Sequence, residues 1–333
     1  MRLSVLDQSV ALAGRPHGAS IRETIELARH CEALGYRRFW VSEHHNHDTI
    51  TGTAPEIVMA AIGATTERIR IGSAGIMLPH YSALKVAEQF RVLDAIAPGR
   101  IDLGVGRAPG SDGRTAYALN PHAPPGADDF PAQVRDLMAW VSGDPLPENH
   151  PFADIRAFPE GETIPETWML GTSNYGAQVA AHFGIPYCFA HFITQGEGCG
   201  QALDLYRQHY RPSARHPKPT STVCVWALMA DTEEEADFQF MSRARTRLAR
   251  DRGILLPVEP PDVAASHPYS AQERARMQAM REQAFVGTPE NVGNRLRRLA
   301  ENLGLDELVI LTWTYELAAR KSSYELFARE FGI

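Results

Sequence analysis

Short runs of strand-forming residues alternate with segments of helical spacing in the first third of the chain. Leu3–Leu6 is a short apolar run, and apolar residues then recur at helical intervals over Ser20–Leu34 until Gly35, a typical helix end. The further strands predicted here are Arg38–Ser42, Ile69–Ser73 and Arg100–Val105, and the further helices are Pro55–Thr65 and Ala83–Ile96. This alternation predicts a parallel sheet built from β-α units.

The pattern is less even in the rest of the chain, but the alternation continues. Arg107–Asp128 is rich in Gly and Pro and predicts an extended loop, and Asp144–Pro165 predicts a Pro-rich connection. The predicted strands are Thr167–Leu170, Pro186–Phe189, Thr222–Ala230 and Asp306–Leu311, and the predicted helices are Phe130–Ser142, Tyr175–Phe183, Ala202–Tyr210, Glu233–Asp251 and Tyr315–Phe331. Eight strands with following helices predict a (β/α)8 barrel, with a doubly wound open sheet as the alternative.

One irregular block, Arg252–Gly287, interrupts the pattern before the last β-α unit and holds several prolines. No low-complexity tract, linker or internal repeat divides the chain, so residues 1–333 are predicted to form one domain with this block as an insertion. A long excursion inside a compact fold is typical of a functional lid or a mobile segment.

Composition narrows the class of protein. Of the 333 residues, 44% are hydrophobic and 22% are charged, which is ordinary for a globular protein with a large core. A net charge of −7 argues against a general nucleic-acid binder. No apolar run approaches the roughly 20 residues that span a bilayer, and the first ten residues do not resemble a secretory signal. The four cysteines form no C-x-x-C pair, which predicts reduced thiols in a cytoplasmic protein.

A cluster of histidines follows the second predicted strand, where a parallel barrel has its active site. The segment is Glu43-His44-His45-Asn46-His47. His and carboxylate are ligands of zinc and iron, but adjacent His44 and His45 on an extended chain point in opposite directions, so we predict no metal site. The residues either hold the strand end by hydrogen bonds or, as we favour, present His44 as a proton donor or acceptor. Its usual pKa of about 6.5 suits proton exchange near neutral pH.

Glycines after the fourth predicted strand superficially match a dinucleotide-binding motif. Gly104-Val105-Gly106 and Gly110 have part of the required spacing, but Pro109 and a long predicted loop stand where that motif opens a helix. We interpret Arg107 as a cation at the rim of the site, suited to phosphate or carboxylate. The alternative is an ion pair with a nearby acid such as Asp112.

The turn after the fifth predicted strand predicts an anion site. Its sequence is Gly171-Thr172-Ser173-Asn174-Tyr175-Gly176. The glycines permit close backbone approach, and two hydroxyls and free helix amides can bind an anion. The alternative is a plain helix cap by Ser173 or Asn174. Because Arg107 lies after the preceding strand and no P-loop lysine is present, the site would hold a cofactor phosphate rather than transfer it.

Five arginines occur close together in the helix predicted over Glu233–Asp251 and just after it. They are Arg243, Arg245, Arg247, Arg250 and Arg252, and three glutamates, Glu233–Glu235, precede them. Acid at the start and base at the end of a helix complement its macrodipole. This pattern predicts a solvated helix, and Arg295, Arg297 and Arg298 are interpreted in the same way.

Several segments, mostly around strand ends, share motifs with one known family. They are Glu32–Tyr36, Trp40–Asn46, Ile71–Pro79, Pro98–Gly110, Val286–Pro289 and Asp306–Leu308. Together they resemble the bacterial luciferase-like flavin monooxygenases over most of the chain. They look most like the branch of small bacterial proteins of poorly defined substrate, rather than light-emitting luciferase subunits.

The resemblance implies a barrel that binds FMN, usually as a dimer. Arg107 and the Gly171–Gly176 turn match the positions that hold the flavin phosphate. Ala74-Gly75 matches the strand end under the flavin ring, where the family often has a non-proline cis peptide. His44 matches a histidine beside the reactive face, and Arg252–Gly287 matches the mobile loop that shields the flavin.

The resemblance also implies an enzyme that uses reduced FMN and dioxygen to oxidise a small organic substrate. A separate, transiently bound flavin reductase is expected, because the chain offers no convincing dinucleotide fold. A flavin-binding protein without monooxygenase turnover and a deazaflavin-dependent hydride-transfer enzyme remain as alternatives. A homodimer is expected through the helices Pro55–Thr65 and Ala83–Ile96, since the first is apolar nearly all round. The sequence names no substrate.

Overall fold

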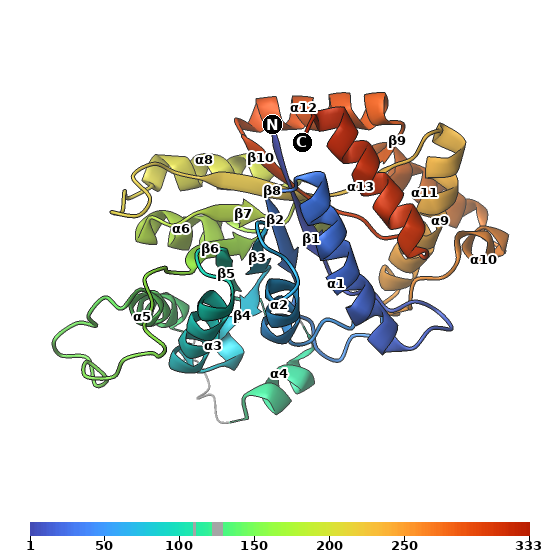
Figure 1. The fold of residues 1–333 in the computed structure, drawn as a ribbon. Helices are drawn as coiled ribbons and strands as arrows, with labels where there is room; N and C mark the ends of the chain where they lie inside the picture. The colour runs from blue at the N-terminus through green and yellow to red at the C-terminus, as the bar shows by residue number, and fades with distance from the viewer. Residues whose placement is uncertain (109–110, 122–128) are drawn as a thin grey trace.

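Eight parallel strands close on themselves at the centre of the fold (Figure 1). The computed structural model describes residues 1–108, 111–121 and 129–333. The barrel strands are β1 (Arg2–Asp7), β2 (Arg38–Val41), β3 (Arg70–Ser73), β5 (Ile101–Gly106), β6 (Glu166–Gly171), β7 (Tyr187–Phe189), β8 (Ser221–Met229) and β10 (Glu307–Leu311). They pair in this order, and pairing of β10 with both β8 and β1 closes the ring. The predicted (β/α)8 barrel is therefore confirmed, and the open sheet is excluded.

Helices cover the outside of the barrel. They are α1 (His17–Leu34), α2 (Pro55–Gly63), α3 (Ala83–Ile96), α5 (Phe130–Ser142), α6 (Asn174–Phe183), α8 (Cys199–His209), α12 (Pro289–Leu303) and α13 (Leu317–Phe331). The predicted bounds of α3 and α5 agree with the structure, and α1 ends at Gly35, whose φ of 94° is left-handed as expected of a helix-ending glycine. No helix in the described part of the chain is long and apolar enough to cross a bilayer.

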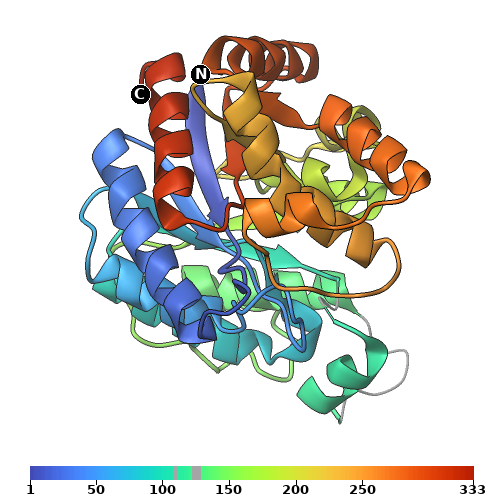
Figure 2. The ribbon, with the colours of Figure 1, turned by 90° about the vertical axis from the view of Figure 1, so that its right-hand side faces the viewer.

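The segment predicted as an extended loop after β5 contains a helix, so that prediction is wrong in part. Helix α4 (Gly113–Leu119) begins after Asp112, whose carboxylate accepts a hydrogen bond of 2.9 Å from the Thr115 N–H. The Gly and Pro content of the segment predicted a loop, so the prediction missed the cap at Asp112 and the short helix that follows it. Figure 2 shows α4 standing away from the barrel. Gly110, which the dinucleotide alternative needs, and Pro109, which argues against it, lie outside the described residues, as do residues 122–128.

Three helices leave the barrel between β8 and β9 (Phe285–Gly287), which itself pairs with the end of β8. They are α9 (Glu233–Arg250), α10 (Pro261–Ser266) and α11 (Ala271–Gln283). The chain between α9 and α10 is tied back to the loop after β1, because the Val258 N–H donates to the Ala11 carbonyl at 2.7 Å. The predicted block 252–287 thus holds two helices, and its role as a lid stays a prediction. The smaller elements are β4 (Ile76–Met77), which pairs with β5, a 3-10 turn (Leu78–His80) and α7 (His191–Thr194).

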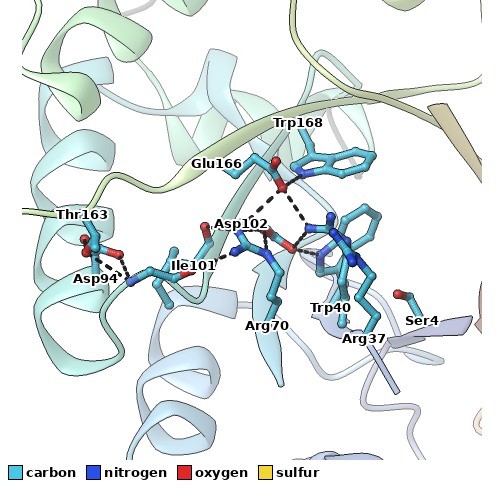
Figure 3. Close-up of polar contacts among 12 residues, drawn as sticks. Ser4, Arg37, Trp40, Arg70, Asp94, Ile101, Asp102, Thr163, Glu166 and Trp168 are labelled. Carbon is cyan, nitrogen blue, oxygen red and sulfur yellow. Dashed lines mark hydrogen bonds and ion pairs between the residues drawn. The ribbon is translucent and has the colours of Figure 1, made fainter. Parts of the chain in front are cut away.

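Charged residues fill the amino-terminal end of the barrel (Figure 3). The buried Arg38 guanidinium lies 2.7 Å from Asp102, 2.9 Å from Glu166 and 3.0 Å from Glu307. Burial alone would lower the pKa of Arg38, but these three carboxylates outweigh it and raise that pKa above its usual value. Because these residues stand at or next to the start of their strands, the carboxyl-terminal end of the barrel is left for a binding site.

Candidate functional site

A cavity of about 740 Å³ opens at the carboxyl ends of the strands. Every site residue predicted from the sequence lines it: His44, Ala74, Gly75, Arg107, Gly171, Thr172, Ser173, Tyr175 and Gly176. These residues come from the ends of β2, β3, β5 and β6, which are consecutive around the barrel. The fold thus brings into one space residues that lie more than a third of the chain apart. Their roles toward a ligand remain predictions.

One end of the cavity combines a cation with free backbone donors. The Arg107 guanidinium lies over the Tyr175 ring, 4.3 Å from its centre. Ser173 occupies the N-cap position of α6, but its side chain makes no capping hydrogen bond. The plain-cap interpretation is therefore not what the structure shows for Ser173. No ion pair joins Arg107 to Asp112 among the described residues, where Asp112 caps α4 instead.

The two glycines of this turn are not required by packing within the chain. A Cβ at Gly171 would come no closer than 3.8 Å to a neighbouring atom, and one at Gly176 no closer than 3.7 Å, which are ordinary contacts. Neither residue has a positive φ. The space that side chains would fill is thus open to a ligand, and the turn fits a phosphate held by backbone amides.

The Ala74–Gly75 peptide bond is cis, as the resemblance implied. A Cβ at Gly75 would lie 2.8 Å from a methyl carbon of Leu170 and 2.9 Å from the Gly104 carbonyl oxygen, too close for any side chain. The cavity wall at Ala74–Gly75 is therefore built from backbone and small residues, which suits the close approach of a flat ring.

His44 faces the cavity from the end of β2, partly covered by neighbouring residues. Its ring is 5.5 Å from that of His47, and its Nδ1 is 3.3 Å from the Ser42 hydroxyl. Burial, followed by the charges of His47, Arg250 and His45, lowers the pKa of His44 to about 3. His44 is therefore neutral at pH 7 in the ligand-free chain, and its role in proton exchange stays a prediction.

The buried carboxylate of Glu43 is a feature that the sequence analysis did not single out. It accepts hydrogen bonds from the Tyr81 hydroxyl at 2.6 Å and the Met77 N–H at 3.1 Å, and it lies 2.8 Å from Nε2 of His45. Burial, followed by Glu43, raises the pKa of Tyr81 well above its usual value. The hydrogen-bonding interpretation of the cluster thus holds for His45, which contacts Glu43, and the proton-exchange role of His44 stays a prediction. An acid directly after a buried strand was the available signal.

Helix α9 is not the solvated helix that its charge pattern predicted. Arg243, Arg247 and Arg250 line the cavity, and the Arg243 guanidinium lies 3.9 Å from the centre of the Trp226 ring. Among the described residues, Arg245 and Arg252 are the only two of these five arginines that have ion-pair partners, Glu259 and Glu273. A helix macrodipole favours an order of charges along the helix but not a buried face, and α10 and α11 pack against α9.

The described residues contain no group of three or more His, Cys, Asp or Glu side chains arranged to hold a metal ion. A sequence model of the family described as luciferase-like monooxygenase matches residues 1–307. The chain belongs to this family.

Relatives within the family are similar along nearly their whole length. A luciferase-like monooxygenase of Escherichia coli is 38% identical, over 95% of this chain and 93% of that protein. The N-acetyl-S-alkylcysteine monooxygenase of Bacillus subtilis is 35% identical, over 98% of this chain and 97% of that protein. The crystal structure of apo-MsnO8 superposes with a TM-score of 0.89 at 33% identity, covering 99% and 98% of the two chains.

More distant solved structures share the fold. The oxygenating constituent of 3,6-diketocamphane monooxygenase from Pseudomonas putida, in complex with FMN, has a TM-score of 0.71 at 19% identity, covering 99% of this chain and 97% of that one. An F420-dependent secondary alcohol dehydrogenase has a TM-score of 0.70 at 14% identity and covers 97% of both chains. Flavin and deazaflavin chemistry thus both occur on this fold.

Proposed function

We propose that this member of the luciferase-like monooxygenase family uses FMN, reduced by a separate reductase, together with dioxygen to oxidise a small organic substrate. The observation that carries the proposal is the single cavity onto which Arg107, the Gly171–Gly176 turn, the cis Ala74–Gly75 bond and His44 all open. Each of these matches a part of a flavin site: phosphate, ring and reacting face.

The phosphate would be held between Arg107 and the start of α6. The guanidinium is already oriented by the Tyr175 ring, and the first amides of α6 have no side-chain cap. A charge-assisted contact with the guanidinium and backbone donors at a helix start are together well suited to a dianion. The small residues at Ala74–Gly75 would leave room for the flat ring beside them.

Reduced FMN, when bound, would supply the electrons with which dioxygen reacts. The chain's own contribution would be position and proton control. His44 is neutral at pH 7 and lies partly covered from solvent, so it can accept a proton from a group that reacts beside it. The predicted lid over residues 252–287 would limit the entry of water, and the reductase would be a separate protein.

Titration of the purified protein with four ligands tests the proposal: oxidised FMN, reduced FMN, riboflavin and a deazaflavin cofactor. FMN is expected to bind much more tightly than riboflavin, since only FMN carries the phosphate. Oxygen uptake with reduced FMN then separates an enzyme from a flavin-binding protein without turnover. Tighter binding of the deazaflavin, with no oxygen uptake, would favour the hydride-transfer class that the F420-dependent neighbour represents.

A further inference from the structure

Three arginines of α9 form a row on the wall of the cavity. Arg243, Arg247 and Arg250 stand at intervals of four and three residues, so their side chains leave one face of the helix. All three line the cavity, and the first two also line a small cleft of about 30 Å³ beneath α11. We call these three residues the arginine row.

In the described part of the chain, the row has no carboxylate in direct contact with it, and Asp251, whose charge reaches Arg247, pairs with Arg276. Among the described residues, no Asp or Glu lies within ion-pair distance of any of its three guanidinium groups. The two carboxylates that do line the cavity are already engaged, Glu43 by Tyr81 and His45, and Asp112 by Thr115 and Asn46. Four arginines against two engaged acids make the cavity positive inside a chain of net charge −7.

A row of positive charges without a contacting carboxylate lowers the stability of the fold unless another group compensates the charge. Burial, followed by the charges of Arg247 and Arg250, lowers the pKa of Arg243 well below its usual value. Stacking of Arg243 on Trp226 holds the guanidinium in place but supplies no counter-charge. Like charges held close together without a contacting carboxylate favour the binding of an anionic ligand.

The row comes from a different part of the barrel than the proposed phosphate end of the cavity. Arg107 follows β5 and the Gly171–Gly176 turn follows β6, whereas α9 follows β8, and β7 stands between β6 and β8. The charge of Arg250 does reach His44 and His47, since it contributes to the lowered pKa of both. An anion on the row would therefore sit on the side of the cavity that holds the candidate proton acceptor.

Apolar side chains line the same cavity, and one of them, Trp226, contacts Arg243. They include Ile50, Leu255, Leu311, Trp226 and Trp313. A ligand that satisfies both features has an anionic head group and an apolar body. We propose that the arginine row binds the anionic group, such as a carboxylate, of an otherwise apolar substrate. This inference rests on the proposed function, because it concerns the substrate of the same cavity.

The first test compares two probes that differ only in charge, octanoate and octanamide, by isothermal titration calorimetry. Wild-type protein is expected to bind octanoate at least about tenfold more tightly, the usual scale for hydrogen bonds to a charged group. Arg243→Gln and Arg247→Gln should each remove most of this preference, and Arg247→Lys should keep part of it. Arg245→Gln is the matched control, because Arg245 is on the same helix but pairs with Glu259 away from the cavity.

Equal binding of the two probes to wild type would overturn the inference. A preference for octanoate that survives both glutamine variants would also overturn it. Thermal unfolding of the ligand-free variants guards against loss of the fold: Arg247→Gln should melt no lower than wild type, since it relieves repulsion within the row. A lower melting temperature for Arg247→Gln than for Arg245→Gln would contradict the absence of a counter-charge.

The same variants distinguish the substrate from the cofactor as the source of the anion. FMN and riboflavin are titrated against Arg247→Gln and Arg107→Ala. The inference expects FMN affinity to fall in Arg107→Ala and to stay unchanged in Arg247→Gln. If FMN affinity falls in Arg247→Gln instead, the row holds the cofactor phosphate and the inference is wrong. If wild type binds no FMN at all, the proposed function fails while the octanoate comparison still stands.

Discussion

Arg107 and Tyr175 show how two residues far apart in sequence make one contact at the cavity rim. Arg107 directly follows the fourth barrel strand, and Tyr175 lies in the first turn of the helix after the fifth. The ring holds the guanidinium by a cation–π contact rather than an ion pair, so the positive charge is oriented but not neutralised. It remains available for an anionic ligand.

Arg107→Ala is expected to weaken FMN binding by about 1.5–3 kcal/mol, because it removes a charge-assisted hydrogen bond to the phosphate. Riboflavin binding should change little, since riboflavin has no phosphate to lose. Flavin fluorescence titration measures both. An equal loss for FMN and riboflavin would mean that Arg107 acts on the fold rather than on the phosphate.

His44 should make the protein sensitive to acid. Its pKa is about 3 in the folded chain and about 6.5 in the unfolded chain. Between these values the unfolded chain binds the proton and the folded chain does not, so stability falls as pH drops from 6.5 toward 3. His44→Asn should therefore show a smaller fall of Tm from pH 7 to pH 4.5 than wild type. His17→Asn, at an exposed position, is the control and should follow wild type.

His44→Ala is also expected to cut coupled substrate oxidation by roughly 10²-fold, the usual scale of general acid–base catalysis. FMN affinity should stay nearly unchanged, because the predicted phosphate contacts lie elsewhere. The measurement is product formed per reduced FMN consumed. Wild-type coupling in the variant would assign His44 a structural role.

Local sequence signals predicted the helices whose ends are marked by typical start or stop residues. Gly35 ends α1 as expected, and the bounds of α3 and α5 were read correctly. The cavity residues could be named because they follow strands, and a barrel gathers strand ends. The arginine row could not be assigned, because the sequence pattern of α9 fits a solvated helix equally well. In the folded chain α10 and α11 pack against α9, and Arg243 and Arg247 line the cleft beside α11.

Helices α2 and α3 present apolar side chains to solvent. Ile57 of α2 is 68% exposed, and Val92 and Ile96 of α3 are 48% and 44% exposed. The two helices lie against each other, as the contact between Gln89 and Glu56 shows. Exposed apolar side chains on neighbouring helices favour an interface with a second copy of the chain.

Ile57→Glu is expected to shift a homodimer toward monomer, because it would bury an unpaired charge in the interface. Sedimentation velocity at micromolar concentration measures the change. Phe238→Glu, at an exposed apolar position of α9, is the matched control and should leave the assembly unchanged. A wild-type protein that already sediments as a monomer would contradict the dimer.

At the scale of the whole molecule, the barrel divides structural and binding roles between its two ends. The amino-terminal end is closed by Arg38 and its three carboxylates, whereas the carboxyl-terminal end is open. The cavity at the open end has a volume of about 740 Å³, within the usual range of a cofactor site. The sequence offers no convincing dinucleotide-binding motif, so we propose that a separate protein supplies the reduced cofactor.

The purified protein alone is therefore expected to oxidise NADH slowly, even with FMN present. Addition of a flavin reductase should start oxygen uptake, because the reductase supplies the reduced cofactor. Absorbance at the NADH band and an oxygen electrode follow the two reactions. Rapid NADH oxidation without any reductase would show that the two-component proposal is wrong.

The segment between β8 and β9 can change in evolution independently of the barrel strands. The segment with α9, α10 and α11 departs from β8 and returns at β9, which pairs with β8 over Ala227↔Phe285 to Met229↔Gly287. Its length and side chains can therefore vary without altering the register of the eight barrel strands. The proposed phosphate end belongs to the barrel itself, while the arginine row belongs to this segment. Descendants of one ancestor could thus diverge in what they oxidise and still inherit the same means of holding their cofactor.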